Sequence, residues 1–140
     1  MTLLEIFQKK YKKGLKPARK IKVEENEGNI EYKWKLCHLD NQERIDHLIT
    51  QMRYRLFQGD GRAIYNIGYQ DDGTPIGLPH PILYSNLELF HRMMDELDCN
   101  LKSVKIFKGK QGYCANILIE KTEDDDMYET LIEQFYTFQI

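Results

Sequence analysis

The stretch Ile30-Glu-Tyr-Lys-Trp-Lys-Leu36 decides how the fold begins. Apolar and charged residues alternate along its whole length. The apolar members are Ile30, Tyr32, Trp34 and Leu36, and the charged members are Glu31, Lys33 and Lys35. A period of two residues is typical of a strand with one face on the core and the other in solvent. We therefore expect a half-buried strand over 30–36 whose charged side chains lie on the outer face.

Two later segments have the three- and four-residue apolar spacing of an amphipathic helix. The first is 41–58, and Asp40 followed by Glu43 predicts a capping box at its start. The second follows the chain break Pro79-His80-Pro81. The apolar positions are Ile45, Leu48, Ile49, Met52 and Leu56 in the first helix, and Leu83, Leu87, Phe90, Met94 and Leu97 in the second.

Four more strands are predicted around the second helix. Arg62–Tyr69 is rich in aromatic and branched residues, and Gln70-Asp-Asp-Gly73 is a turn. Pro75–Leu78 predicts a short return strand at a sheet edge, because a proline cannot donate to a ladder. Leu101–Lys108 and Tyr113–Lys121 predict the last hairpin.

The resulting order, βαββαββ, predicts an α+β domain. Two helices that each carry one apolar stripe need a shared sheet to cover, so we expect a two-layer sandwich with both helices on one face of a mostly antiparallel sheet. A split βαβ and an AlbA-like arrangement both fit this order. The predicted organisation is a basic N-terminal arm at 1–24, the α+β core at 25–122, and an acidic and apolar C-terminal segment at 123–140.

The charge of the chain is unevenly distributed. Residues 1–22 hold eight basic side chains against Glu5, a net +7, whereas the whole chain carries −2, so the other 118 residues carry −9. Clustered cations bind nucleic-acid phosphates by releasing counterions. A solvated arm that pairs with the acidic tail is the alternative. The predicted phosphate contacts are Lys9, Lys10, Lys12, Lys13, Lys16, Arg19, Lys20 and Lys22, with Lys108 and Lys110 of the last hairpin.

A second surface combines basic and aromatic side chains. Lysines on the last hairpin and arginines on the first helix accompany tyrosines that are available for base stacking. Strand alternation predicts that Lys102 and Lys108 share one face and that Lys105 lies on the other. The remaining members of this predicted surface are Gln51, Arg53, Arg55, Lys110, Tyr65, Tyr69 and Tyr113.

Several classes of site find no support in the sequence. No Gly-x-x-x-x-Gly-Lys-Ser/Thr motif occurs, so no such loop cradles nucleotide phosphates. Cys37, Cys99 and Cys114 lack metal-ligand spacing, and no two histidines stand four residues apart on a helix. Neither a signal peptide nor a membrane-spanning apolar run is present. We expect a cytoplasmic protein that needs no cofactor and binds neither nucleotide nor membrane.

The segment 27–36, reading EGNIEYKWKL, and the segment 65–78, reading YNIGYQDDGTPIGL, resemble the N-terminal accessory domain of the GTP-binding protein 1 and 2 family. These proteins are translational, elongation factor-like GTPases. The resemblance runs from about Glu27 to Lys121. It implies a non-enzymatic binding module that associates with RNA or ribosomal complexes.

Two alternatives remain at this point. Glu27, Glu31, Asp71 and Asp72 also resemble the acidic residues of the Schlafen AlbA-type domain, which implies a metal-dependent endoribonuclease. Without that activity, Glu31 is a solvated strand residue and Asp71-Asp72-Gly73 is an ordinary turn. The other alternative is a protein adaptor that docks Met127–Ile140 on a partner through Leu131, Ile132 and Phe135.

Overall fold

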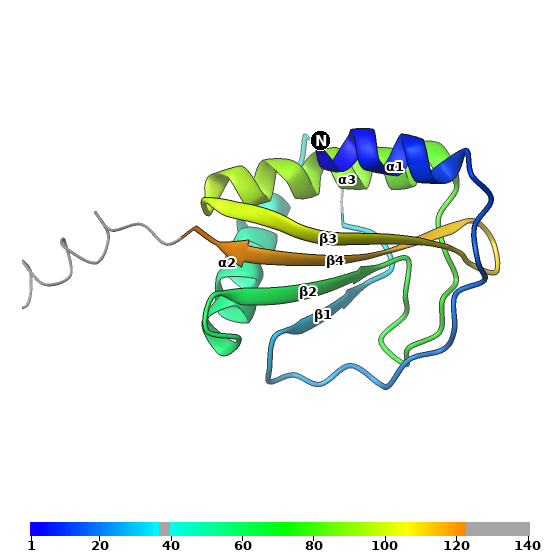
Figure 1. The fold of residues 1–140 in the computed structure, drawn as a ribbon. Coiled ribbons are helices and arrows are strands. Elements are labelled where there is room, and N and C mark those ends of the chain that lie inside the picture. Colours follow the sequence, from blue (N-terminus) through cyan, green and yellow to red (C-terminus); the bar gives the residue numbers. More distant parts are fainter. Residues whose placement is uncertain (37–39, 123–140) are drawn as a thin grey trace, which may run out of the picture.

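The computed structural model describes residues 1–36 and 40–122. Cys37 and the predicted partner-binding segment 127–140 therefore lie outside the described residues. Three helices and four strands follow one another along the described chain (Figure 1). They are α1 (Leu3–Tyr11), β1 (Ile30–Lys33), α2 (Gln42–Gln58), β2 (Arg62–Ile67), α3 (His80–Glu96), β3 (Cys99–Lys108) and β4 (Tyr113–Lys121).

The four strands form one mixed sheet in the order β1-β2-β4-β3. β1 is parallel to β2, whereas β4 is antiparallel to both β2 and β3. β4 lies between β2 and β3, so β2, α3 and β3 form a split β-α-β unit. The predicted α+β class and the mostly antiparallel sheet are confirmed. The predicted return strand at 75–78 is wrong, because that segment makes only single bridges, from Pro75 to Tyr69 and from Leu78 to Tyr113.

The helices form one layer against the sheet. α2 packs on β2 and α3, α3 packs on β3 and β4, and α1 packs on α3 and β3 (Figure 1). The prediction that both amphipathic helices share one face is confirmed, and α1 joins them. Leu3 and Phe7 of α1 are buried in the same core as Leu87 and Phe90 of α3 and Ile117 of β4. The opposite face of the sheet carries no helix in the described part of the chain.

Two local predictions at the start of the domain are wrong. The N-cap of α2 is Asn41, whose side-chain oxygen accepts a hydrogen bond from the Arg44 amide at 3.1 Å, and not Asp40. The expected facing of the first strand is also inverted at Glu31, which is only 5% exposed, while Ile30 and Trp34 are 41% and 45% exposed. Register places Glu31 opposite the buried Tyr65, on the helix side of the sheet, where Arg55 of α2 compensates its charge.

Candidate nucleic-acid interface

The open face of the sheet is built by strand alternation. Ile106, Ala115 and Ile117 point into the core, so their neighbours along the same strands point to the opposite side. Pairing then arranges these outward side chains in rows across the sheet. One row is Lys105, Asn116 and Asn66, and the next is Ser103, Leu118 and Ile64.

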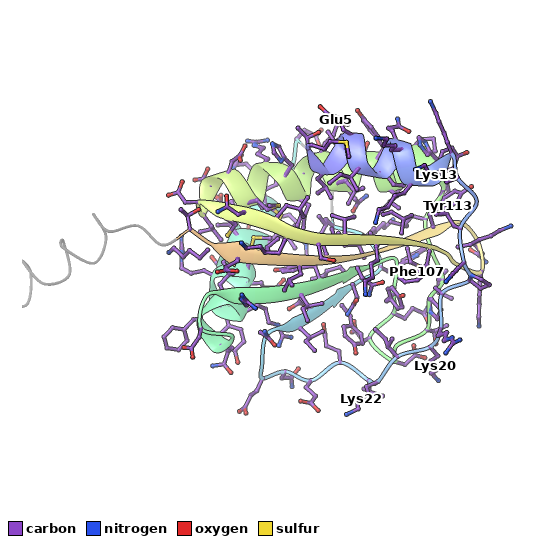
Figure 2. The ribbon with its side chains drawn as sticks, viewed as in Figure 1. Glu5, Lys13, Lys20, Lys22, Phe107 and Tyr113 are labelled. Atoms are coloured by element: carbon purple, nitrogen blue, oxygen red, sulfur yellow. The ribbon has the colours of Figure 1, made fainter. Side chains whose placement is uncertain are left out.

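A groove of about 630 Å³ lies at one end of this open face. Its sides come from the segment that follows α1 and from β3, while Asn116 contributes from β4 and Tyr69 from the segment after β2. Phe107 projects there from β3, near the loop that carries Lys20 (Figure 2). The lining residues are Lys16, Pro17, Arg19, Ile21, Tyr69, Lys105, Phe107 and Asn116.

Backbone hydrogen bonds hold the segment 16–24 across the end of the sheet. The Ala18 amide donates to the Lys108 carbonyl at 2.8 Å, and the Lys108 amide donates to the Lys16 carbonyl at 2.9 Å. Further along, the Ile21 amide donates to the Gly73 carbonyl at 3.0 Å. Because these bonds use the main chain, the side chains of Lys16 and Arg19 are left exposed beside the groove.

The floor of the groove is a neutral polar network. The Tyr69 hydroxyl donates to Asn116 Oδ1 at 3.4 Å, and Asn116 Nδ2 donates to Asn66 Oδ1. Burial raises the pKa of Tyr69 to about 12, so its hydroxyl stays protonated at neutral pH. These contacts fix the Asn116 amide in one orientation, with its Oδ1 toward Tyr69 and its Nδ2 toward Asn66.

The charge of the groove comes entirely from cations. Lys16, Arg19 and Lys105 are exposed, and no acidic residue is among the lining residues. Within residues 1–36 and 40–122, no carboxylate lies within 4.0 Å of these three cations. Three cations beside a half-buried aromatic ring therefore create an anion-attracting groove with an apolar contact surface.

The other predicted basic residues do not converge on one point. Lys13, Lys20 and Lys22 are spread along the segment after α1 (Figure 2). Lys108 and Lys110 are exposed on the last hairpin. Lys10 differs from its neighbours because its ammonium donates to the Val104 carbonyl at 2.5 Å, and this contact ties α1 to β3.

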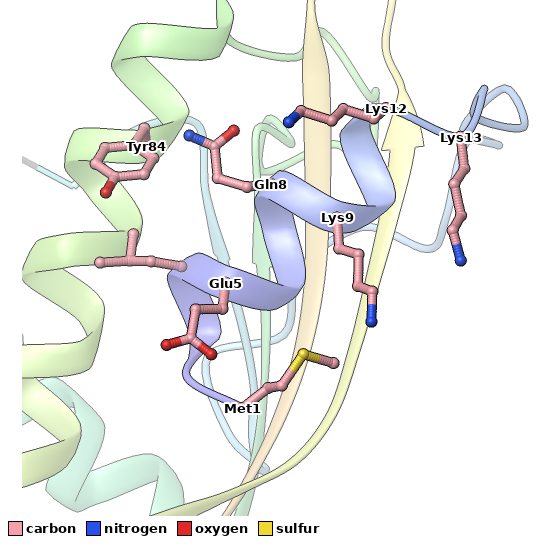
Figure 3. Close-up of a pocket in the computed structure, with 8 residues that line it drawn as sticks. Met1, Glu5, Gln8, Lys9, Lys12, Lys13 and Tyr84 are labelled. Atoms are coloured by element: carbon pink, nitrogen blue, oxygen red, sulfur yellow. The ribbon is translucent and has the colours of Figure 1, made fainter.

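A second pocket, of about 590 Å³, lies between α1 and α3. Lys9, Lys12 and Lys13 line it, together with Gln8 and with Tyr84 from α3 (Figure 3). In this view Lys12 points toward the side of Gln8 and Tyr84, away from Lys9 and Lys13, and Glu5 lies in the same pocket (Figure 3). This surface therefore offers scattered positive charge rather than a formed anion site.

The predicted second surface is only partly present. Arg55 is 4% exposed and Tyr65 is 1% exposed, so both belong to the interior. The predicted pairing of Lys102 with Lys108 is also wrong, because a β-bulge between Leu101 and Ser103 shifts the alternation by one residue. Lys105 instead lies on the open face, opposite Asn116. Sequence reasoning missed Phe107, whose only signal was its place between two lysines in a strand.

The four candidate nuclease carboxylates are not arranged around a shared centre. Glu31 is buried against Arg55 at 2.7 Å and also faces Lys33 at 3.5 Å, which contradicts the solvated-strand interpretation as well. Glu27 and Asp71 are exposed. Hydrogen bonds from Thr74 lower the pKa of the exposed Asp72, as in a turn that this side chain caps. Across 1–36 and 40–122, no cluster of three potential metal ligands is found.

Glu24 is a carboxylate that the sequence did not single out. Its Oε2 accepts a hydrogen bond from the Tyr32 amide at 2.5 Å and lies 3.9 Å from Arg55. Partial burial raises the pKa of Glu24, and the nearby Glu31 and Asp71 charges act in the same direction. Glu24 thus accepts a hydrogen bond from a main-chain amide of the edge strand β1, a structural role rather than a catalytic one.

The two described cysteines, Cys99 and Cys114, are free thiols whose surroundings do not favour the reactive thiolate. Burial raises the pKa of Cys99 to about 11 and that of Cys114 to about 12. Thiolates are the nucleophilic form, so neither residue is suited to covalent chemistry at neutral pH. None of the described helices has the length and apolar character that crossing a membrane requires.

Comparison with known proteins supports the family resemblance. The chain is 33% identical over 110 residues to GTP-binding protein 2 of Homo sapiens and 41% identical over 110 residues to that of Mus musculus. It is 34% identical over 105 residues to R625, an uncharacterized protein of Acanthamoeba polyphaga mimivirus. No family model and no solved structure matches.

The matched region is a small part of the larger relatives. Each GTP-binding protein 2 match covers 75% of this chain but only 18% of that protein, and the R625 match covers 73% of this chain and 56% of R625. The similarity therefore concerns one domain and not a whole GTPase. This chain carries a domain that is similar to a segment of GTP-binding protein 2, as the sequence predicted.

Proposed function

We propose that this chain is a non-enzymatic RNA-binding module that acts beside translational GTPases, on RNA or ribosomal complexes in the cytoplasm. The groove on the open face of the sheet is the observation that carries the proposal. Its three cations lack acidic partners in the described part of the chain and stand beside Phe107. The similarity to GTP-binding protein 2 supports the same context.

The groove differs in charge from the pocket between α1 and α3, because its lining holds cations without an acidic residue whereas that pocket also contains Glu5. The groove cations line the open end of the sheet, and Lys20 and Lys22 extend the positive charge along the segment after α1 (Figure 2). RNA phosphates bound there would release counterions, so the affinity should fall steeply with salt. Lys9, Lys12 and Lys13 on α1 would add weaker, less localised attraction.

Charge-matched variants test this assignment. The triple variant Lys16→Gln, Arg19→Gln, Lys105→Gln removes the groove cations and preserves the main-chain bonds of the segment. We expect its RNA affinity to fall and the slope of log K against log salt to decrease by roughly 2, since each cation contributes about 0.7 with single-stranded RNA. The variant Arg44→Gln, Arg53→Gln, Arg92→Gln is the control, because these exposed arginines lie on α2 and α3.

Fluorescence anisotropy with tRNA, a structured ribosomal RNA fragment and a single-stranded RNA, across a salt series with Mg²⁺ and Mn²⁺, gives the readout. Equal weakening by both triple variants would assign the binding to net charge and remove the groove from the proposal. Absence of binding by the unaltered chain would contradict the RNA module itself and favour a protein partner. Cleavage of the RNA during the assay would overturn the non-enzymatic part.

A further inference from the structure

The open sheet face extends well beyond the groove. Along β4, the outward residues that reach solvent run from Asn116 to Glu120, a span of about 13 Å at 3.3 Å per residue, and the neighbouring Cys114 is covered. Phe107, Ile64 and Leu118 lie on this face and are all half-buried. No helix covers them in the described ranges, so apolar surface is left open between polar ends.

The two ends of the face are both basic. Lys16, Arg19 and Lys105 stand at the groove end. At the far end, the side chains of Arg62 and Lys102 are 61% and 47% exposed, and both face Glu120 at 3.2 Å and 3.7 Å. Within the described residues, these three side chains together carry a net charge of +1. The face therefore presents cations at both ends and apolar side chains between them.

From this arrangement we infer that the RNA bound by this domain is single-stranded and lies across the open sheet face, with its bases on Phe107, Leu118 and Ile64 and its phosphates near the cations at each end. The inference rests on the proposed RNA-binding function. It adds the class of RNA and the path that the strand takes.

The physical reason for a single strand is access to the base faces. In an RNA duplex the bases are stacked on one another, so a protein meets phosphates, 2′-hydroxyls and the shallow minor groove. A flat face with a half-buried aromatic ring gains free energy from bases that are free to stack on it, and such stacking tolerates any sequence. Apolar contacts at Leu118 and Ile64 would bring a duplex no comparable gain.

The first test compares a 5′-labelled 12-nucleotide oligouridine with an RNA hairpin of matched phosphate number, at one fixed salt concentration. We expect Phe107→Ala to weaken oligouridine binding by about 5- to 150-fold, the range for losing one base-stacking contact, and to leave hairpin binding nearly unchanged. Phe107→Tyr should restore oligouridine binding, because tyrosine also stacks. Phe57→Ala is the matched control, since Phe57 is 79% exposed on α2.

A second measurement needs no substitution. In two-dimensional amide NMR of the unaltered chain, oligouridine should shift the signals of Ile64, Phe107, Leu118 and the Asn116 side-chain amide, and leave α1 signals unshifted. Shifts confined to α1, or equal affinity for oligouridine and the hairpin with no effect of Phe107→Ala, would overturn the single-strand inference while RNA binding itself stands. If the unaltered chain binds neither RNA, the proposed function fails, and this inference fails with it.

Discussion

The guanidinium of Arg55 on α2 donates from Nε to Glu31 Oε2 of β1 at 2.7 Å, and both residues are buried. The remaining guanidinium nitrogens of Arg55 donate to three main-chain carbonyls, those of Glu25, Glu27 and Gly28, at 2.8–3.2 Å. This one side chain therefore connects the helix layer, the edge strand and the segment that leads into it. It is a structural centre rather than the RNA contact that the sequence suggested.

Removing the Arg55 charge should strongly destabilise the domain. Arg55→Met leaves the Glu31 carboxylate buried without its main cation, and breaking a buried pair in this way costs about 3–5 kcal/mol. Adding Glu31→Leu should recover part of the loss, because no uncompensated charge then remains. Urea unfolding followed by circular dichroism measures both variants. Arg53→Met is the control, and its exposed position predicts a change within about 0.5 kcal/mol. Equal stability of Arg55→Met and Arg53→Met would contradict the role of the pair.

Two adjacent lysines on α1 should behave differently. The Lys10 ammonium donates to the Val104 carbonyl, whereas Lys9 is exposed. We expect Lys10→Ala to lower the free energy of unfolding by about 1 kcal/mol and Lys9→Ala to change it by less than about 0.5 kcal/mol. Both substitutions remove one positive charge. A difference in urea midpoint therefore reports the hydrogen bond, and identical midpoints would show that the contact contributes nothing.

Gly73 should not tolerate a side chain. Its φ is +88°, and an added Cβ would lie 1.9 Å from the Ile21 carbonyl oxygen. Gly73→Ala should therefore cost more than the roughly 1–2 kcal/mol of the left-handed conformation alone, and speed hydrogen exchange at the Ile21 amide. Gly14→Ala is the matched control, because Gly14 has a φ of +74° with no atom within 4 Å of the added Cβ. If both variants lost the same free energy of unfolding, segment 16–24 would be able to move away from the added Cβ without loss of stability.

The cysteine thiols should resist alkylation in the folded protein. At pH 8, the pKa values of Cys99 and Cys114, about 11 and about 12, lie above the pH, so almost no thiolate is present. In a Cys37→Ser background, iodoacetamide should label neither residue until urea unfolds the chain. Raising the pH from 8 to 9 should increase the slow native rate about tenfold, since the thiolate fraction rises tenfold per unit below the pKa. Rapid labelling of the native protein, detected by mass spectrometry, would contradict the raised pKa values of the two thiols.

Local patterns in the sequence were sufficient for most elements. The apolar spacing of 83–94 predicted α3, and the alternation in 113–121 predicted β4, because the period of burial is set by backbone geometry within one element. The same patterns placed both amphipathic helices on one face. The Gln70–Gly73 turn also followed from local chemistry, since the Asp72 carboxylate accepts a hydrogen bond from the Thr74 amide at 2.9 Å.

Periodicity fixes which residues share a face, but not what that face contacts. Glu31 looked like a solvent residue, and its burial depends on Arg55, which comes from another element and supplies the compensating charge. The bulge after Leu101 is likewise a property of strand pairing, and it moved Lys105 to the open face.

By itself, the sequence determined most of the elements, the fold class, the uneven charge and the similarity to GTP-binding protein 2. Only the tertiary structure decided that Lys16, Arg19, Lys105 and Phe107 surround one groove. The physical reason is distance along the chain. Segments about 90 residues apart meet through main-chain hydrogen bonds between 16–18 and Lys108, and no local pattern encodes that pairing.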